Sequence, residues 1–496
     1  MLTLDKKKII ILKAVLLLVF LVYLFFLGKS FIVNATMVNI AETAQDLLKG
    51  DFLLSKWDLS YSSNLFSQIF YYLIPVHLFG VSSKAIAIAI FLIVIATIVT
   101  GSLLLKDNPK DITFQDIILL ICFCGLGNYA LQALQLNGAS LPFVFLTLFF
   151  ANKYLQTEKY QYLIITSLLN IFLVFGDIFS LVICIFPMML YCFLSIFHKE
   201  HPVKYIRLLL TILLSTVFGV FLYTQYLHFN KSGAMYQWFA SKSFIDDYIN
   251  ESNMSNVVIF IKSFTFIQNM NFFDDYIFSP HVIMYIFRTI ISLIGLVLIA
   301  KIIFNVTTNK EEDNNDIILF SISSALIFTI FFGIFVEANF LEYVNQIFAI
   351  IPIGIAILIM RANKCFINLD KFQYYSIFLL SAFILITFCN KKLDEQIKES
   401  KYPLIAEILE ARKLEFGYSN YEDAAVLNLL SKGKLKIAPI LKEVPFNAIL
   451  KKDYFSQEAQ FYLVNIDETE NYRKLIDESK TNTITVDDTI ITVYKN

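Results

Sequence analysis

The sequence predicts an all-α polytopic membrane protein with about eleven transmembrane helices, followed by a small α/β domain outside the cytoplasm. Of the 496 residues, 57% are hydrophobic and only 16% are charged, and the mean hydropathy is +0.65. A soluble domain of this length is rarely so apolar. A series of apolar windows and an uneven distribution of Lys and Arg between the loops are the other two observations that lead to this fold class.

Each predicted span is an apolar window long enough to cross about 30 Å of hydrocarbon. The windows lie near 9–30, 84–105, 114–131, 141–155, 160–175, 179–197, 206–228, 280–304, 316–336, 343–361 and 374–389. The first is too long for a signal peptide and lacks a small-residue cleavage site, so we expect it to be retained. The run 65–80 is too short and too interrupted to span, and it predicts a helix lying in the interface.

The positive charges indicate the orientation of these spans. Lys6, Lys7 and Lys8 precede the first span and place the N-terminus in the cytoplasm. In this orientation the inner loops carry Lys and Arg throughout, whereas the short outer turns at 132–140, 176–178 and 337–342 carry none. An odd number of spans then places the C-terminal segment outside the cytoplasm.

The chain therefore divides into a transmembrane domain, residues 1–390, and an extracytoplasmic domain, residues 391–496. The first has two large outer loops, 31–83 and 229–279. In the second, a helix is predicted from Tyr402 to Lys413, then alternating β-type stretches and a hairpin over 483–494 that turns at Asp487 and Asp488.

Several function classes find no support in the sequence. The net charge of −1 gives no basic field for nucleic acid. A phosphate loop, a Gly-x-Ser-x-Gly elbow, a His-Glu-x-x-His motif and a nucleotide fingerprint are all missing from the 496 residues, so the sequence shows no energy source such as ATP.

The polar stretch after the first span is the strongest candidate for a site. It runs Gly50-Asp-Phe-Leu-Leu-Ser-Lys-Trp-Asp-Leu-Ser60 and brings carboxylates, cations and an aromatic ring within a dozen residues. We interpret it as the floor of an active site at the membrane surface; an ordinary solvated loop is the alternative. The upstream acid Asp46 is the weaker candidate, because Ala41 to Leu48 has the pattern of an amphipathic turn or two.

Further polar groups fall on the predicted outer side. Asp177 follows Gly176 at the outer end of a helical hairpin, Arg288 lies about two turns into a span, and Glu342 flanks another outer turn. The segment Phe272-Phe-Asp-Asp-Tyr-Ile277 repeats Phe244-Ile-Asp-Asp-Tyr-Ile249. Its carboxylates, Asp274 and Asp275, suit a divalent metal or a sugar; acidic turns that keep the loop solvated are the alternative.

Three groups of motifs carry a family resemblance. They are the stretch 50–60, Phe175-Gly-Asp-Ile-Phe-Ser180 with Pro187 downstream, and in the tail Phe416-Gly-Tyr-Ser-Asn-Tyr421 with Leu430-Ser-Lys-Gly433 and Lys436-Ile-Ala-Pro439. Together they resemble GT-C-type bacterial membrane glycosyltransferases, and length and span pattern are similar to the serotype-converting O-antigen glucosyltransferases. The chain departs from the family pattern in having Ser62 and Gln68 where Asp is usual.

The resemblance implies transfer of a sugar, glucose or another hexose, from a polyprenyl-phosphate donor to a cell-surface glycan such as O-antigen, outside the bacterial cytoplasmic membrane. It implies a carboxylate as general base, cations for the lipid phosphate, and aromatic rings for the sugar or lipid. The candidates are Asp51 or Asp58 for the base; Lys56, Lys84 or Arg288 for the phosphate; and Trp57, Tyr71, Tyr72, Asp177, Asp274, Asp275 and Glu342 as lining. The resemblance indicates no certain cofactor, and a divalent metal is optional.

Other functions remain open. A transporter or flippase of lipid-linked sugars would also be polytopic, but it more often has broken helices at mid-membrane and related halves. A non-catalytic scaffold related to the transferases is favoured by Ser62 and Gln68. An enzyme that polymerises or ligates glycans would be expected to use Arg or His in the loop 229–279, which has neither.

Overall fold

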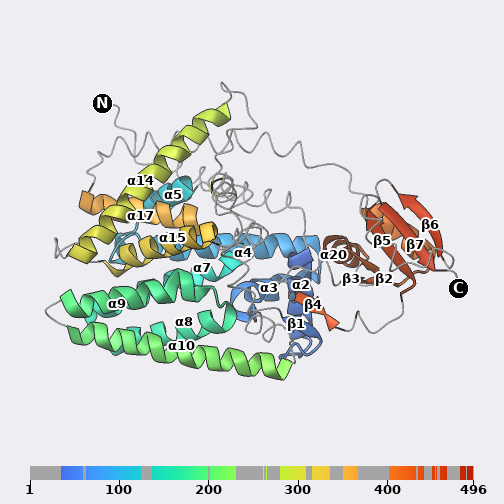
Figure 1. The fold of residues 1–496 in the computed structure, drawn as a ribbon, viewed down its shortest axis with the longest axis horizontal. Helices are drawn as coiled ribbons and strands as arrows, with labels where there is room; N and C mark the ends of the chain where they lie inside the picture. The colour runs from blue at the N-terminus through green and yellow to red at the C-terminus, as the bar shows by residue number, and fades with distance from the viewer. Residues whose placement is uncertain are drawn as a thin grey trace.

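A computed structural model gives the fold of the chain (Figure 1). It describes residues 35–59, 63–124, 134, 137–198, 202–230, 261, 264, 280–308, 316–335, 350–366, 402–431, 434–440, 449–452, 454, 459–465, 481–486 and 489–494. The predicted spans at 9–30 and 374–389 lie outside these residues, so the count of about eleven spans stays a prediction.

The transmembrane domain is a bundle of apolar helices. Its main helices are α4 (Ser83–Leu103), α5 (Phe114–Cys124), α7 (Leu141–Thr157), α8 (Tyr160–Gly176), α9 (Phe186–His198), α10 (Pro202–Asn230), α14 (Pro280–Thr308), α15 (Ile317–Phe335) and α17 (Ile350–Phe366). Within the described residues, four segments are long and apolar enough to cross a membrane: Ser83–Leu103, Gly138–Thr157, Pro202–Asn230 and Arg288–Val306. The chain is therefore a multi-pass membrane protein, and most predicted spans agree with these helices to within a few residues.

Small residues allow the helices to approach closely, as is usual in membranes. A Cβ atom added at Gly219 of α10 would lie 3.0 Å from Val174 of α8. One added at Gly295 of α14 would lie 2.8 Å from Ile355 of α17. The side-chain amide of Asn170 also donates to Ser215 Oγ at 2.7 Å, which fixes α8 against α10 within the apolar interior.

The predicted interfacial helix 65–80 is found as a π-helical turn, η1 (Leu65–Ile69), followed by α3 (Phe70–Phe79). It is attached to the end of α8, because Asn64 N–H donates to the Gly176 carbonyl at 3.1 Å and Ser63 Oγ donates to the Phe175 carbonyl at 2.6 Å. A Cβ at Gly176 would be 3.3 Å from the backbone of Phe66. The first outer loop is thus fixed to the α8–α9 turn, which the sequence predicts on the same side of the membrane.

The tail forms a five-stranded mixed sheet in the order β3-β2-β5-β7-β6. Its strands are β2 (Phe416–Ser419), β3 (Lys436–Pro439), β5 (Phe461–Asn465), β6 (Thr481–Val486) and β7 (Thr489–Tyr494), and its helices are α19 (Tyr402–Ala411) and α20 (Tyr421–Leu430). Helix α19 covers most of the predicted helix 402–413, and β6 and β7 pair antiparallel across the predicted hairpin, whose turn at Asp487 and Asp488 lies outside the described residues. The core lies between sheet and helices, with Leu409, Leu427 and Phe461 fully buried.

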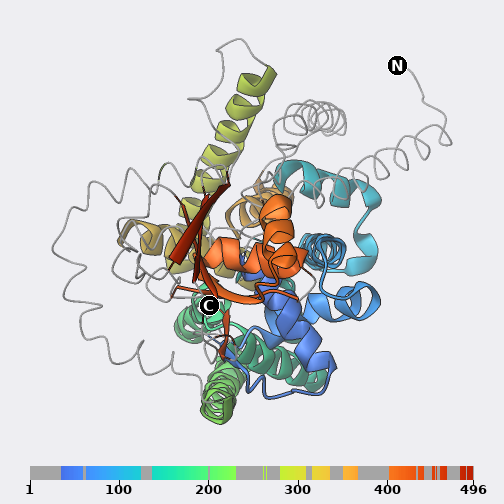
Figure 2. The same cartoon turned by 90° about the vertical axis from the view of Figure 1, so that its right-hand side faces the viewer.

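The tail packs on the first outer loop (Figures 1 and 2). Helix α20 lies against α2 (Ala35–Leu48), and the two helices share one hydrophobic cluster. The Glu422 carboxylate accepts a hydrogen bond from Ala35 N–H at 2.7 Å, at the start of α2. Strand β4 (Ile449–Lys451) pairs antiparallel with β1 (Trp57–Leu59), so that Trp57 lies opposite Lys451.

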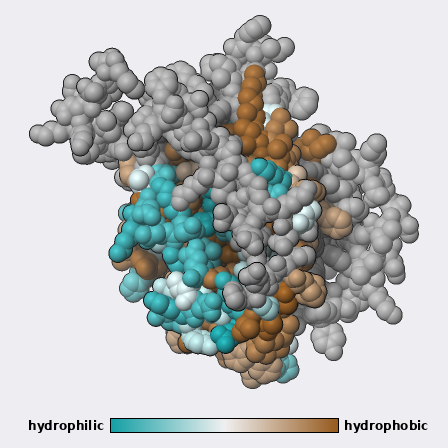
Figure 3. Space-filling model, turned by 90° about the vertical axis from the view of Figure 1, so that its left-hand side faces the viewer, coloured by the Kyte–Doolittle hydropathy of each residue, from teal (hydrophilic) through white to brown (hydrophobic). Residues whose placement is uncertain are grey.

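Polar and charged residues gather at the end of the bundle away from the tail, and Figure 3 shows a hydrophilic area on this face beside hydrophobic surface. The buried Arg361 of α17 pairs with Asp316 and, at 2.6 Å, with Asp107. Lys153 donates to the backbone carbonyl of Asp107, and Lys106 pairs with Asp116. These cations belong to loops that the sequence predicts on the cytoplasmic side, and the structure gathers them at one end.

Candidate active site

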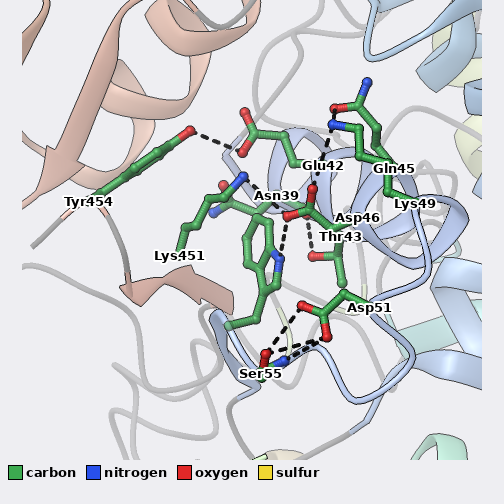
Figure 4. A network of polar contacts seen from close by, with 11 residues as sticks. Asn39, Glu42, Thr43, Gln45, Asp46, Lys49, Asp51, Ser55, Lys451 and Tyr454 are labelled. Carbon is green, nitrogen blue, oxygen red and sulfur yellow. Dashed lines mark hydrogen bonds and ion pairs between the residues drawn. The ribbon is translucent and has the colours of Figure 1, made fainter.

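Helix α2 carries two carboxylates one turn apart on the same face, Glu42 and Asp46. The helix forms because its apolar residues, among them Val38, Ala41 and Ala44, pack into the cluster with α3, α4 and α20. The acids point toward the β1–β4 pair (Figure 4). Covered by that pair, the Glu42 side chain is only 9% exposed.

Asp46 is held in place by three groups. Its Oδ2 accepts a hydrogen bond from the indole Nε1 of Trp57 at 3.0 Å and lies 3.2 Å from Lys451 Nζ. Its Oδ1 lies 3.8 Å from the Nζ of Lys49, in the turn that follows α2. These charge-assisted contacts fix the position of the carboxylate.

Glu42 has a different environment. The Tyr454 hydroxyl donates to its Oε2 at 3.4 Å. Burial raises the pKa of Glu42 above its ordinary value; the charge of Lys451 opposes this, and the charge of Asp46 adds to it. A carboxylate with a raised pKa is a stronger base once it has lost its proton, which suits general base catalysis near neutral pH.

Lys451 occupies the space between the acids and two aromatic rings. Its Nζ lies 5.1 Å from the ring centre of Trp57 and 5.6 Å from that of Tyr454. The ammonium group therefore combines an ion pair with two cation–π contacts. Lys451 and Tyr454 come from the tail, more than 400 residues after Glu42 in the sequence, and no local pattern could have indicated them.

The two predicted base candidates lie beside this cluster. Asp51 closes the turn after α2, where its Oδ1 accepts from Ser55 N–H at 3.2 Å. Asp58 is the middle residue of β1, half-buried between Trp57 and Leu59, which are buried. Because side chains alternate along a strand, Asp58 is on the opposite face from Trp57 and hence from Asp46. Both remain predicted candidates.

The predicted phosphate-binding cations are spread over three places. Lys56 is exposed next to Trp57, and its carbonyl accepts from Lys452 N–H at 2.8 Å. Lys84 is exposed at the start of α4, with Nζ 4.0 Å from the ring centre of Phe79. Arg288 is buried in α14, where it donates to the Phe123 carbonyl of α5 and so links two helices.

The predicted aromatic residues are buried in this structure. Trp57 has no exposed surface, and its indole N–H is used by Asp46. Tyr71 packs into the core of the helical bundle, whereas Tyr72 packs into the cluster around α2. Their proposed contact with sugar or lipid stays a prediction.

Asp177 lies in the turn after α8 and is 2% exposed. Its Oδ1 accepts from Phe179 N–H at 3.0 Å. Burial raises the pKa of Asp177 to about 6, and hydrogen bonds from Phe179 and Ser140 oppose the rise. Gln68, where the resemblance leads one to expect Asp, is buried in η1, and its neighbour Ser67 donates to the Gly176 carbonyl before this turn.

Some predicted residues cannot be placed. Asp274, Asp275, Glu342 and Ser62 lie outside the described residues. Among the residues that the structure describes, no group of three or more His, Cys, Asp or Glu side chains is arranged to hold a metal ion. The optional divalent metal stays a prediction for the loop that carries the Asp-Asp pairs.

The described residues define a multi-pass membrane protein with a cluster of acidic residues where α2 and β1 meet the tail. No family model matches the chain, and no curated protein matches it. Among solved structures, it is similar to the crystal structure of ArnT from Cupriavidus metallidurans bound to undecaprenyl phosphate, with 12% identity, 98% of each chain covered and a TM-score of 0.44. At this level the similarity does not establish a shared activity, so the function must be inferred from the residues of this chain.

Proposed function

We propose that this protein is a membrane glycosyltransferase. It transfers a hexose from a polyprenyl-phosphate donor to a cell-surface glycan, such as O-antigen, on the outer face of the bacterial cytoplasmic membrane. The proposal rests on Glu42 and Asp46, two carboxylates of the first outer loop that lie beside Lys451 of the tail. The family resemblance implies an acid–base group in this loop.

The chemistry requires one proton acceptor. An acceptor hydroxyl oxygen attacks the anomeric carbon of the donor sugar, the bond from that carbon to the phosphate oxygen breaks, and polyprenyl phosphate leaves as an anion. The hydroxyl proton passes to the general base. Glu42 suits this role because its burial favours proton uptake, whereas Asp46 is engaged by Trp57 and Lys451.

The experiment is mass spectrometry of the surface glycan from cells with and without the protein. The variants are Glu42→Gln, Asp46→Asn, Asp51→Asn and Asp58→Asn. The matched control is Asp111→Asn, because Asp111 is an exposed acid at the opposite end of the bundle. Correct insertion is checked for each variant by its yield and thermal unfolding in detergent.

We expect a sugar that depends on the wild-type protein, is retained with Asp111→Asn and is lost with Glu42→Gln. Loss with Asp51→Asn or Asp58→Asn alone would keep the transferase but move the base to the predicted candidate. An unchanged glycan in every strain, with donor and acceptor supplied, would refute the transferase and favour a flippase or a scaffold.

A further inference from the structure

We propose that the tail is a working part of the active site, and that its Lys451 is a positioning residue that holds the Asp46 carboxylate and sets how tightly Glu42 binds a proton. The proposal rests on the proposed function and assigns a division of labour within that same site. It follows from the hydrogen bonds that hold β4, from the groups that face the two acids, and from the effect of neighbouring charges on the proton affinity of a carboxylate.

Hydrogen bonds made by Lys452, directly after β4, hold this strand against the transmembrane domain. Lys452 N–H donates to the Lys56 carbonyl at 2.8 Å, and Lys452 Nζ donates to the carbonyl of Asn230, the last residue of α10, at 3.0 Å. The Asn230 amide in turn donates to the Leu53 carbonyl at 2.9 Å. The loop, α10 and the tail are thus joined around β4, which fixes the backbone that carries Lys451.

The β1–β4 register determines where Lys451 points. Trp57 and Lys451 are directly opposite partners, and such partners in an antiparallel pair have side chains on the same face. Trp57 uses that face to contact Asp46. Lys451 therefore reaches the same carboxylate, as Figure 4 shows.

The tail also holds the helix that bears the acids. Glu422 accepts from the first N–H of α2, and the amide of Asn39 donates to the Tyr421 hydroxyl at 3.2 Å. Further along α2, Tyr454 and Lys451 contact Glu42 and Asp46, respectively. The tail therefore fixes α2 at its start and again at the two carboxylates.

A neighbouring carboxylate makes an acid bind its proton more tightly, and a neighbouring ammonium group makes it bind the proton less tightly. Among the described residues, the charged and titratable groups that face the pair are Lys49, directly after α2, and Lys451 and Tyr454 from the tail. Lys49 is mostly exposed, whereas the Lys451 side chain is 20% exposed and is in contact with Trp57. Lys451 is therefore the cation that acts most strongly on the proton affinity of Glu42.

The test measures proton occupancy of Glu42 directly. Dicyclohexylcarbodiimide modifies protonated carboxyl groups in apolar surroundings, and mass spectrometry of peptides gives the pH of half-labelling. The full-length protein is compared with Lys451→Gln, Lys451→Arg and Lys436→Gln, all in detergent. Lys436 is an exposed lysine on the tail strand β3 and serves as the matched control.

Removing the cation should move half-labelling of Glu42 upward by about one pH unit in Lys451→Gln. Lys451→Arg should restore the wild-type value, and Lys436→Gln should leave it unchanged. The acid limb of kcat/KM should move with the labelling. Equal half-labelling in the wild type and Lys451→Gln, with both folded, would overturn the proposal.

The labelling experiment also separates this proposal from the proposed function. If the protein transfers no sugar but Lys451→Gln still shifts the labelling of Glu42, the transferase fails and the coupling between tail and acids stands. If Lys451→Gln unfolds, Lys451→Arg and Tyr454→Phe decide instead. Arginine must preserve the labelling pH, and loss of the Tyr454 hydroxyl must raise it.

Discussion

Asp177 allows a quantitative prediction about stability and pH. Its side chain is buried in the turn after α8, and the cost of burying its charge raises its pKa from 3.8 to about 6. A group with a raised pKa binds its proton more tightly in the folded state than in the unfolded state. The folded state is therefore favoured at acidic pH, and this stabilisation is lost as the pH rises through about 6.

The size of the effect follows from the shift. One pKa unit corresponds to about 1.4 kcal/mol, so a rise from 3.8 to about 6 gives a loss on the order of 3 kcal/mol between these pH values. Asp177→Asn replaces the acid with a neutral group of the same shape. The variant should lose this part of the pH dependence and be more stable than the wild type at pH of about 8.

The assay is thermal unfolding of purified protein in detergent at several pH values from about 4.5 to 8. Glu42 and Glu422 also have raised pKa values, and they give a slope of the same sign. The difference between the wild type and Asp177→Asn isolates Asp177, and Asp111→Asn controls for the loss of an exposed acid. A wild type that is more stable than Asp177→Asn at pH of about 8, or parallel curves for the two, would refute the reasoning.

Three further predictions concern packing and polar contacts elsewhere in the fold. Trp57→Phe keeps an aromatic ring but removes the N–H donor to the α2 carboxylate, and thermal unfolding should show a loss of about 1.5–3 kcal/mol. Arg361→Leu leaves Asp316 without its guanidinium partner and should cost about 3–5 kcal/mol, part of which Asp316→Leu in the same chain recovers. Gly295→Val should lower the unfolding temperature by separating α14 from α17, and Ile355→Ala should restore part of it, because an added Cβ lies 2.8 Å from Ile355. Unchanged unfolding in any of these variants would contradict the corresponding contact.

The helices of the bundle could be predicted because their signal is local. The window at 160–175 is found as α8, Tyr160–Gly176, and the window at 206–228 as α10, Pro202–Asn230. An apolar segment in a bilayer must satisfy its backbone hydrogen bonds within itself, so hydropathy alone specifies a helix. The pairing of the last two strands could also be predicted, since their alternating residues and the turn between them are adjacent in the sequence.

The site could be predicted only in part. The sequence directs attention to the first outer loop, and that loop does carry the acidic cluster. The sequence pattern ranks Asp46 below Asp51, because Ala41 to Leu48 has the pattern of an amphipathic turn or two. In the structure this stretch is the second half of α2, and its polar face is covered by β4 of the tail. Burial by a segment some 400 residues away leaves no trace in local periodicity, so neither Trp57 as a donor nor Lys451 as a partner could be foreseen.

The contacts of α2 and η1 bear on the presence of Gln68 at a position where the resemblance leads one to expect Asp. Gln68 lies in η1, where it is 3% exposed, and the neighbouring Ser67 donates to the Gly176 carbonyl at 3.4 Å. A carboxylate at this position would have to bear the cost of burying its charge. On α2, in contrast, Lys451 and Trp57 contact Asp46, and Tyr454 contacts Glu42. These contacts are the reason to look for the proton acceptor on α2 rather than at position 68.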